Sequence, residues 1–209
     1  LLYSLPITTT QVVLGKYGAL LVVFLLPLCF IALYPLMFAQ FGEVYLPTAY
    51  GSLVAFFLLG AALLAVGVFL SSLTDNQGLA AGLGIGTILL NYYCVSLSEY
   101  VSSTAAGTAI ALLVLIAALG FLVKALTRSV PAGLGTGVLL LAGLGICYAL
   151  DSTALEGLLP AMMKKISLFE RFNTFVNGVF DLTNVVYFLS VTLFFLFLTV
   201  ESLEKRRYN

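Results

Sequence analysis

The chain has 209 residues, of which 62% are hydrophobic and 9% are charged, and its formal net charge is zero. A soluble domain carries about 25% charged residues, so this composition excludes an ordinary water-facing surface and indicates an integral membrane protein. The neutral balance gives no reason to expect a nucleic-acid partner. Histidine is absent and the three cysteines lie singly in apolar runs, so we expect no metal or cofactor on this chain.

The first residues, LLYSLPITTTQ, contain several polar side chains and precede a long apolar run. They lack the basic region and the cleavage site of a signal peptide, and position 1 is Leu. We therefore expect the natural protein to extend further at its N-terminus. Thr8 and Gln11 have the spacing of a capping box, which predicts that a helix begins near Thr9. Pro6 separates that helix from any element before it.

Six apolar stretches approach or exceed the 20 or so residues that a helix needs to cross a bilayer. They are residues 12–38, 49–72, 77–97, 107–126, 132–150 and 183–203. We expect an all-α, polytopic bundle of about six transmembrane helices in one domain, residues 1–209. Basic residues near the span ends favour a cytoplasmic location for both ends of the chain. The inner group is Lys16, Lys124, Arg128, Lys205, Arg206 and Arg207, against Lys164, Lys165 and Arg171 outside.

The stretch SSLTDNQ at residues 71–77 predicts a tight cytoplasmic turn. Asp75 is expected to accept from the free backbone N–H groups of the helix that follows. The turn residues Thr74, Asp75, Asn76 and Gln77 then either form a simple helix start or contact a cytoplasmic partner.

Residues 155–181 carry apolar side chains at three- and four-residue steps, with polar side chains on the other face. This pattern predicts an amphipathic helix that lies at the outer interface or penetrates it. The helix is either an ordinary connector or a lid over a substrate path. Asp181 is expected to cap the last span.

Glycines recur at four-residue spacing in two of the spans. Such spacing lets helix backbones approach closely in lipid, so these residues are expected to pack helices together. They are Gly78, Gly82 and Gly86 in the third span and Gly133 and Gly137 in the fifth.

The predicted spans contain no group of residues with the pattern of a catalytic or ligand-binding site. Every acidic residue lies in a loop or at a span end, and no zinc motif or phosphate-binding loop occurs. We therefore expect no catalytic site on this chain. Asn91 lies in the most polar membrane stretch, NYYCVSLS, and either bridges helices or contacts substrate, bridging being the commoner use of such residues.

Three separated motifs, in order, resemble the type-2 ABC exporter permeases. LLYSLPITTTQVVLGKY resembles the cytoplasmic loop of that family, with Leu5 where a serine often stands. GVFLSSLTDNQGLAA resembles the end of the family's next span. The ending FVNGVFDLTNVVYFLSVTLFFLFLTVESLEKRR is similar to the gliding-motility-type and copper-processing-type subgroup. The resemblance covers roughly residues 1–80 and 165–209.

The resemblance implies a truncated start with two earlier spans, and the pair 107–126 and 132–150 as an addition to the six-span pattern. It also implies a second permease subunit, identical or related, and a separate P-loop ABC ATPase that binds ATP and Mg²⁺. A short coupling helix of this family contacts the ATPase, and it would lie at or just before Leu1, Leu2, Tyr3, Ser4, Leu5 and Pro6. The expected location is a bacterial cytoplasmic membrane.

Three functions follow as hypotheses. The first is the permease subunit of an ATP-driven exporter, which forms the substrate pathway and leaves catalysis to its partner. The second is a non-transporting scaffold of a cell-envelope machine, and the third is a channel or secondary transporter. The sequence does not identify a substrate.

Overall fold

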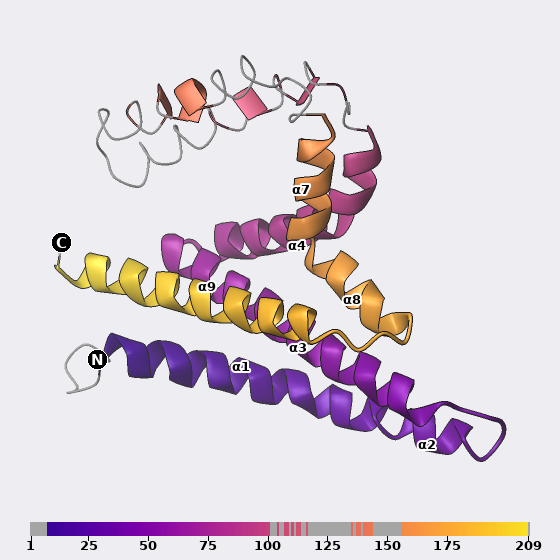
Figure 1. The fold of residues 1–209 in the computed structure, drawn as a ribbon. Helices are drawn as coiled ribbons and strands as arrows, with labels where there is room; N and C mark the ends of the chain where they lie inside the picture. The colour runs from indigo at the N-terminus through magenta and orange to yellow at the C-terminus, as the bar shows by residue number, and fades with distance from the viewer. Residues whose placement is uncertain are drawn as a thin grey trace. The chain divides into compact units, whose positions relative to one another are not determined.

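The structure is a computed structural model that describes residues 8–100 and 156–208, with scattered residues from 104 to 143. Every regular element among these residues is an α-helix, and none of them lies in a strand (Figure 1). This confirms the predicted all-α class. The helices are α1 (Thr9–Ile31), α2 (Tyr34–Phe38), α3 (Leu46–Leu73), α4 (Gln77–Tyr100), α7 (Leu158–Ile166), α8 (Leu168–Val176) and α9 (Leu182–Tyr208).

Four segments of the described chain are long and apolar enough to cross a membrane. They are Thr9–Phe38, which joins α1 and α2, then α3, α4, and α9 as far as Lys205. They correspond to four of the six predicted spans. The other two, 107–126 and 132–150, fall largely outside the described residues, so six spans are not established.

The start of α1 follows directly from the local sequence. The Oγ1 atom of Thr8 accepts a hydrogen bond from the backbone N–H of Gln11 at 3.3 Å. The side-chain Oε1 of Gln11 in turn accepts from the backbone N–H of Thr8 at 3.1 Å. The predicted capping box is therefore present, and it fixes the first turn of α1.

The first predicted span is not one continuous helix. α1 ends at Ile31, and α2 starts at Tyr34. Pro35 explains the interruption, because a proline ring collides with the carbonyl four residues earlier, here that of Ile31. Beside this interruption, the carbonyl of Ala32 accepts a hydrogen bond from the Tyr50 hydroxyl of α3 at 3.1 Å.

The chain divides into two compact units, residues 1–92 with 168–209, and residues 93–167. In the first unit, α1, α3 and α9 lie side by side (Figure 1). α1 runs antiparallel to α3, because the Tyr17 hydroxyl donates to the Ala61 carbonyl at 3.0 Å and Phe24 stacks on Phe57 further along. α9 runs parallel to α3, and Phe195 contacts Phe69. The start of α1 and the end of α9 therefore lie at the same end of this unit.

Small residues on α3 form the core of the first unit. Ala55 and Ala62 are fully buried in a cluster with Leu59, with Leu168 and Phe175 of α8 and with Phe188 of α9. Ala65 belongs to a second cluster with Val13 and Tyr17 of α1 and Leu196 of α9. Because a methyl side chain keeps neighbouring backbones close, three helices can pack on α3 at once.

The second unit contains the end of α4, from Tyr93, and α7. The Cys94 thiol donates to the carbonyl of Met163 at 3.4 Å, and this contact joins the two helices. Gly157 precedes α7 with a φ of 67°, a left-handed conformation that glycine adopts without strain.

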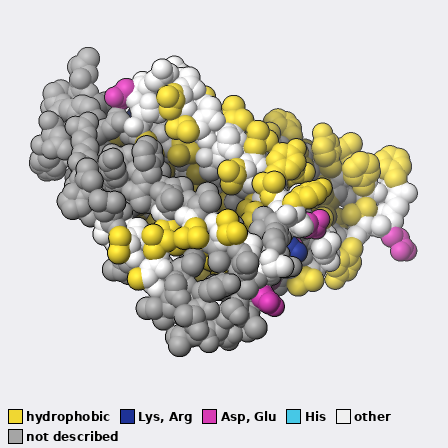
Figure 2. All heavy atoms as spheres, turned by 90° about the horizontal axis from the view of Figure 1, so that it is seen from above, with side chains coloured by type: hydrophobic (Ala, Val, Ile, Leu, Met, Phe, Trp, Pro, Cys, Tyr) yellow, Lys and Arg dark blue, Asp and Glu magenta, His cyan; other side chains and the backbone are white. Residues whose placement is uncertain are grey.

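The described surface is rich in apolar side chains. Figure 2 shows hydrophobic side chains over much of the coloured part of one face, with few acidic or basic ones. Phe30 on α1, Leu90 on α4 and Leu193 on α9 each expose about two thirds of their area, at 67%, 65% and 68%. A soluble monomer rarely exposes so much apolar surface, whereas a bilayer covers it.

Candidate functional site: the half-helix α8

The predicted amphipathic helix over 155–181 is present as two helices rather than one. α7 ends at Ile166, the next residue Ser167 has an extended backbone with a ψ of 119°, and α8 begins at Leu168. The break leaves the backbone N–H of Leu168 without a helical acceptor. The Oδ1 atom of Asn91 on α4 accepts that hydrogen bond at 3.0 Å. Asn91 therefore bridges two helices, as predicted, and it caps α8 from a distant part of the chain.

α8 packs on α3 and α9 of the first unit along one face, and Glu170, Asn173 and Val176 on its other face are exposed. Ser52 of α3 donates to the carbonyl of Phe175 at 3.1 Å, and the rings of Phe56 and Phe172 are 5.9 Å apart. α8 therefore runs antiparallel to α3. Leu168 stands four residues before Phe172, which at 1.5 Å per residue places it about 6 Å further, near the middle of α3.

The beginning of α8 is almost completely buried. Ser167 is 0% exposed and Leu168 is 4% exposed. A helix start that is removed from water must have its backbone groups satisfied inside the protein. Asn91 supplies this acceptor, so the break at Ser167 is compatible with burial.

Arg171 attaches α8 to α9. Its Nη1 atom donates to the Oδ1 atom of Asn184 at 2.9 Å. Its guanidinium carbon lies 3.8 Å from the ring centroid of Tyr187, which is a cation–π contact. Asn184 is only 5% exposed, so Arg171 satisfies a side-chain oxygen that water reaches poorly. The planar guanidinium can form the hydrogen bond and the stacking contact at the same time.

These contacts define what we call the α8 site: α8 itself with Ser52, Asn91, Asn184 and Tyr187. Polar side chains from three long helices, α3, α4 and α9, contact α8 here. The groups form hydrogen bonds and a cation–π contact, and they supply no base paired with a nucleophile. Among the described residues, no group of three or more His, Cys, Asp or Glu is placed to hold a metal ion. The arrangement holds α8 against α3, α4 and α9 through individual polar contacts.

The residues of the predicted cytoplasmic turn lie where α3 ends and α4 begins, and Asn76 stands at the N-cap position of α4. The Oδ1 atom of Asn76 accepts from the backbone N–H groups of Gly78 and Leu79, at 3.0 and 3.2 Å. Asn76 directly precedes Gln77, the first residue of α4, whereas Asp75 stands one residue too early to be the N-cap. Thr74 supports the turn, since its Oγ1 atom accepts from the N–H of Asn76 at 3.2 Å.

Substitution of Asn76 by Ala should destabilise the first turn of α4 by about 1 kcal/mol, because two backbone N–H groups lose their acceptor. Hydrogen exchange measured by mass spectrometry should show faster exchange at the start of α4. Asn76→Asp retains a side-chain acceptor and serves as the control, with nearly normal exchange. Equal exchange rates in the Ala variant and the unmodified protein would show that the cap is energetically unimportant.

The predicted packing glycines make few contacts within this chain. A Cβ atom built on Gly82, Gly86 or Gly137 meets no described atom within 4 Å, and one on Gly78 meets only the Asn76 side chain. Gly133 lies outside the described residues. The close approach occurs instead at Gly60 of α3, where an added Cβ would lie 2.2 Å from Cζ of Phe24. Sequence spacing missed Gly60, since it has no glycine partner at four residues.

The predicted coupling segment Leu1–Pro6 lies outside the described residues. The structure reaches its C-terminal border, where Thr8 caps α1. The predicted cap of the last span is confirmed, since the Oδ1 atom of Asp181 accepts from the N–H of Thr183 at 2.8 Å. Of the predicted sites, the structure thus describes the turn at 74–77, four of the five glycines and Asn91.

A comparison of the chain with protein-family models, with curated proteins and with solved structures finds no match. Function must therefore be argued from the residues and contacts themselves.

Proposed function

We propose that this chain is the membrane-spanning permease subunit of an ATP-driven exporter. In this proposal it forms the substrate pathway, with a second permease subunit, and a separate P-loop ATPase hydrolyses ATP. The observation that carries the proposal is the half-helix α8, a polar-anchored element that starts near the middle of an apolar helical unit.

The directions of the helices are compatible with a membrane protein in which the start of α1 and the end of α9 lie on the same side of the bilayer. α3 and α9 run parallel, so if both cross the bilayer, an odd number of crossings must separate them. α4 alone satisfies this, and so does α4 together with both predicted spans in 107–150. In either arrangement the start of α1 and the end of α9 face the same compartment. The basic residues Lys205, Arg206 and Arg207 favour the cytoplasm.

The α8 site supports a gating role. A continuous membrane helix needs no partner for its backbone, whereas a broken one depends on side chains such as Asn91. Arg171 and Asn91 hold α8 through a few individual hydrogen bonds, and such contacts can be exchanged for water as a passage opens. α8 would then close the pathway at the end where α3 starts, which the proposed orientation places outside.

An external energy source is the second part of the proposal. The sequence contains no phosphate-binding loop, and the spans contain no pair of carboxylates for ion coupling. The segment Leu1–Pro6 precedes a capped helix start, and its sequence resembles the coupling loop of exporter permeases. A displacement of that segment by the ATPase would be transmitted directly to α1. α1 packs on both α3 and α9.

Replacement of Leu2 and Tyr3 by Glu should uncouple this chain from the ATPase subunit. We expect transport-coupled ATP hydrolysis to fall severalfold, because two charges cannot enter an apolar contact without a large desolvation cost. The measurement is ATP turnover by the complex in liposomes, with membrane insertion checked by membrane extraction. Ser4→Ala, in the same segment, removes one hydroxyl and is the control. Unchanged turnover in the Glu variant would exclude the coupling role, and partner binding without any turnover would favour a scaffold.

A further inference from the structure

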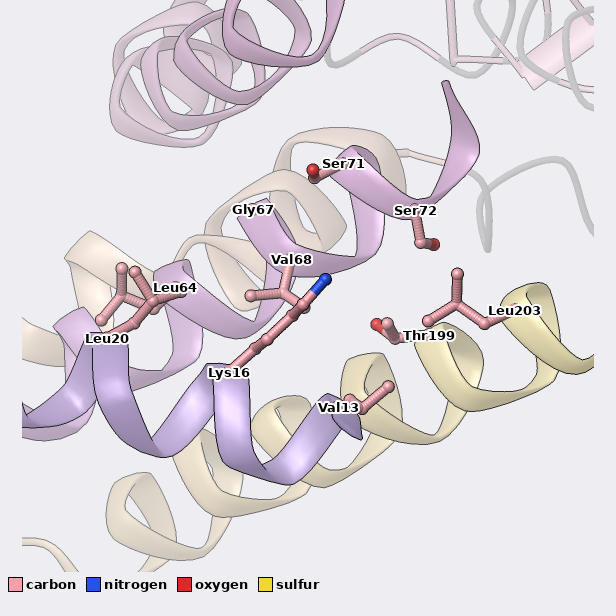
Figure 3. A pocket seen from close by; sticks show the side chains of 10 residues that line it. All are labelled: Val13, Lys16, Leu20, Leu64, Gly67, Val68, Ser71, Ser72, Thr199 and Leu203. Carbon is pink, nitrogen blue, oxygen red and sulfur yellow. The ribbon is translucent and has the colours of Figure 1, made fainter. Parts of the chain in front are cut away.

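A groove opens at the end of the first unit where α1 starts and α9 ends. It has a volume of about 320 Å³ and is lined by Val13, Lys16, Leu20, Leu64, Gly67, Val68, Ser71, Ser72, Thr199 and Leu203. Figure 3 shows the Lys16 side chain extending from α1 toward the last turns of α3. The lining is apolar except for this ammonium group and three hydroxyl groups.

Lys16 has no partner among the described residues: it forms neither a hydrogen bond nor an ion pair there. Ser71 also has no described partner, so its hydroxyl is able to donate. Ser72 and Thr199 differ, because each hydroxyl already donates to a carbonyl of its own helix, Phe69 or Phe195. Two free donors, one of them positively charged, therefore line this groove, and that combination is complementary to a phosphate group.

The rest of the groove is complementary to hydrocarbon. A Cβ atom built on Gly67 meets no atom within 4 Å, so the groove has open space beside α3. The groove walls include the apolar side chains of Val13, Leu64 and Leu203, and Leu20 at the same groove is 40% exposed. A soluble phosphate would make no use of these walls, whereas an acyl chain would cover them.

We propose that this groove binds the headgroup and upper acyl chain of an anionic phospholipid. Lys16 stands seven residues beyond Thr9, or about 10 Å along α1, a depth at which a lysine can extend its ammonium group to the interface. Lys205 lies on α9 two residues after Leu203, so a second basic residue belongs to the same end. Glu201 and Glu204 are close in sequence, but neither lines the groove. A volume near the lower limit for ligand pockets fits part of a lipid rather than a whole one.

The lipid site requires that the helices span a membrane, and it does not depend on export. It adds a role for the bilayer's composition, since an occupied groove joins α1, α3 and α9 next to the predicted coupling segment. An anionic lipid would stabilise this arrangement of the three helices.

The test uses the full chain in a neutral detergent, titrated with short-chain phosphatidylglycerol or with phosphatidylcholine of the same chain length. Binding is read from native mass spectrometry and from the thermal midpoint. We expect phosphatidylglycerol to bind about fivefold more tightly, the size of one basic residue's attraction to an anionic lipid surface. Soluble glycerol phosphate is the third probe, and it should neither bind measurably nor raise the midpoint.

Substitutions at Lys16 and at Gly67 separate the contribution of charge from that of open space. Lys16→Gln should abolish the preference for phosphatidylglycerol, and Lys16→Arg should retain it. Gly67→Leu should weaken the binding of both lipids, because the leucine side chain would fill the groove. Gly15→Leu is the matched control, since Gly15 also faces open space but does not line the groove. A preference that persists in Lys16→Gln, or glycerol phosphate that binds as well as the lipid, would overturn the proposal.

Discussion

Substitution of Phe188 by Ala should lower the free energy of unfolding by about 3–5 kcal/mol, the range measured for buried aromatic truncations. Phe188 is 0% exposed and is the largest fully buried side chain among the described residues. It lies in the cluster that joins α3, α8 and α9, so its removal leaves a cavity beside three helices. The small residues Ala55 and Ala62 on α3 cannot expand to fill that space.

Phe197 provides the matched control. It lies on the same helix, but 61% of its surface is exposed. Phe197→Ala should therefore change the unfolding free energy by less than about 1 kcal/mol. The measurement is the unfolding midpoint of each variant in mixed detergent micelles. Similar losses in the two variants would mean that α9 does not pack on α3 and α8 as described.

Substitution of Arg171 by Met should destabilise the protein by about 2–3 kcal/mol and release α8. The variant loses a charged hydrogen bond, typically worth about 1.5–3 kcal/mol, together with the contact to Tyr187. It also leaves the Oδ1 atom of the buried Asn184 without its donor. Hydrogen exchange in residues 168–176 should rise more than exchange in the first turn of α1.

A double variant distinguishes loss of the pair from loss of one partner. Arg171→Met with Asn184→Leu should recover much of the stability, because an unpaired buried polar group is then no longer present. Lys164→Met controls for the loss of a positive charge, since Lys164 is exposed on α7. The interpretation of Arg171 as an anchor is wrong if Lys164→Met is equally destabilising, or if exchange in α8 does not change.

Local rules predicted those parts of the fold that depend on neighbouring residues. The capping box of Thr8 and Gln11 involves residues three apart, and both of its hydrogen bonds are present. Asp181 likewise caps the helix that begins one residue later. In the turn at 74–77 the sequence offered two adjacent cap residues, Asp75 and Asn76. Which of them is the N-cap depends on where α4 begins, and Asn76 directly precedes its first residue, Gln77.

Features that depend on distant residues were harder to predict. The amphipathic pattern over 155–181 is real, but the break at Ser167 is compensated by Asn91, 77 residues from the N–H group that it binds. The pairing of Arg171 with Asn184 depends on how α8 lies against α9. Gly60 was missed for a similar reason, because its importance comes from Phe24 on another helix. Pro35 is a local signal for the division of the first span, but proline alone does not settle the position, because Pro27 lies inside α1 without ending it.

The most direct test of the proposed function is the purification of the full chain from its native membrane in a gentle detergent. The proposal predicts that a P-loop ATPase co-purifies in stoichiometric amount and that its ATP hydrolysis in liposomes depends on this chain. Mass spectrometry identifies the partner, and a variant of its phosphate-binding lysine supplies the inactive control. Ion-driven flux through the chain alone, with no nucleotide-hydrolysing partner, would contradict the proposal.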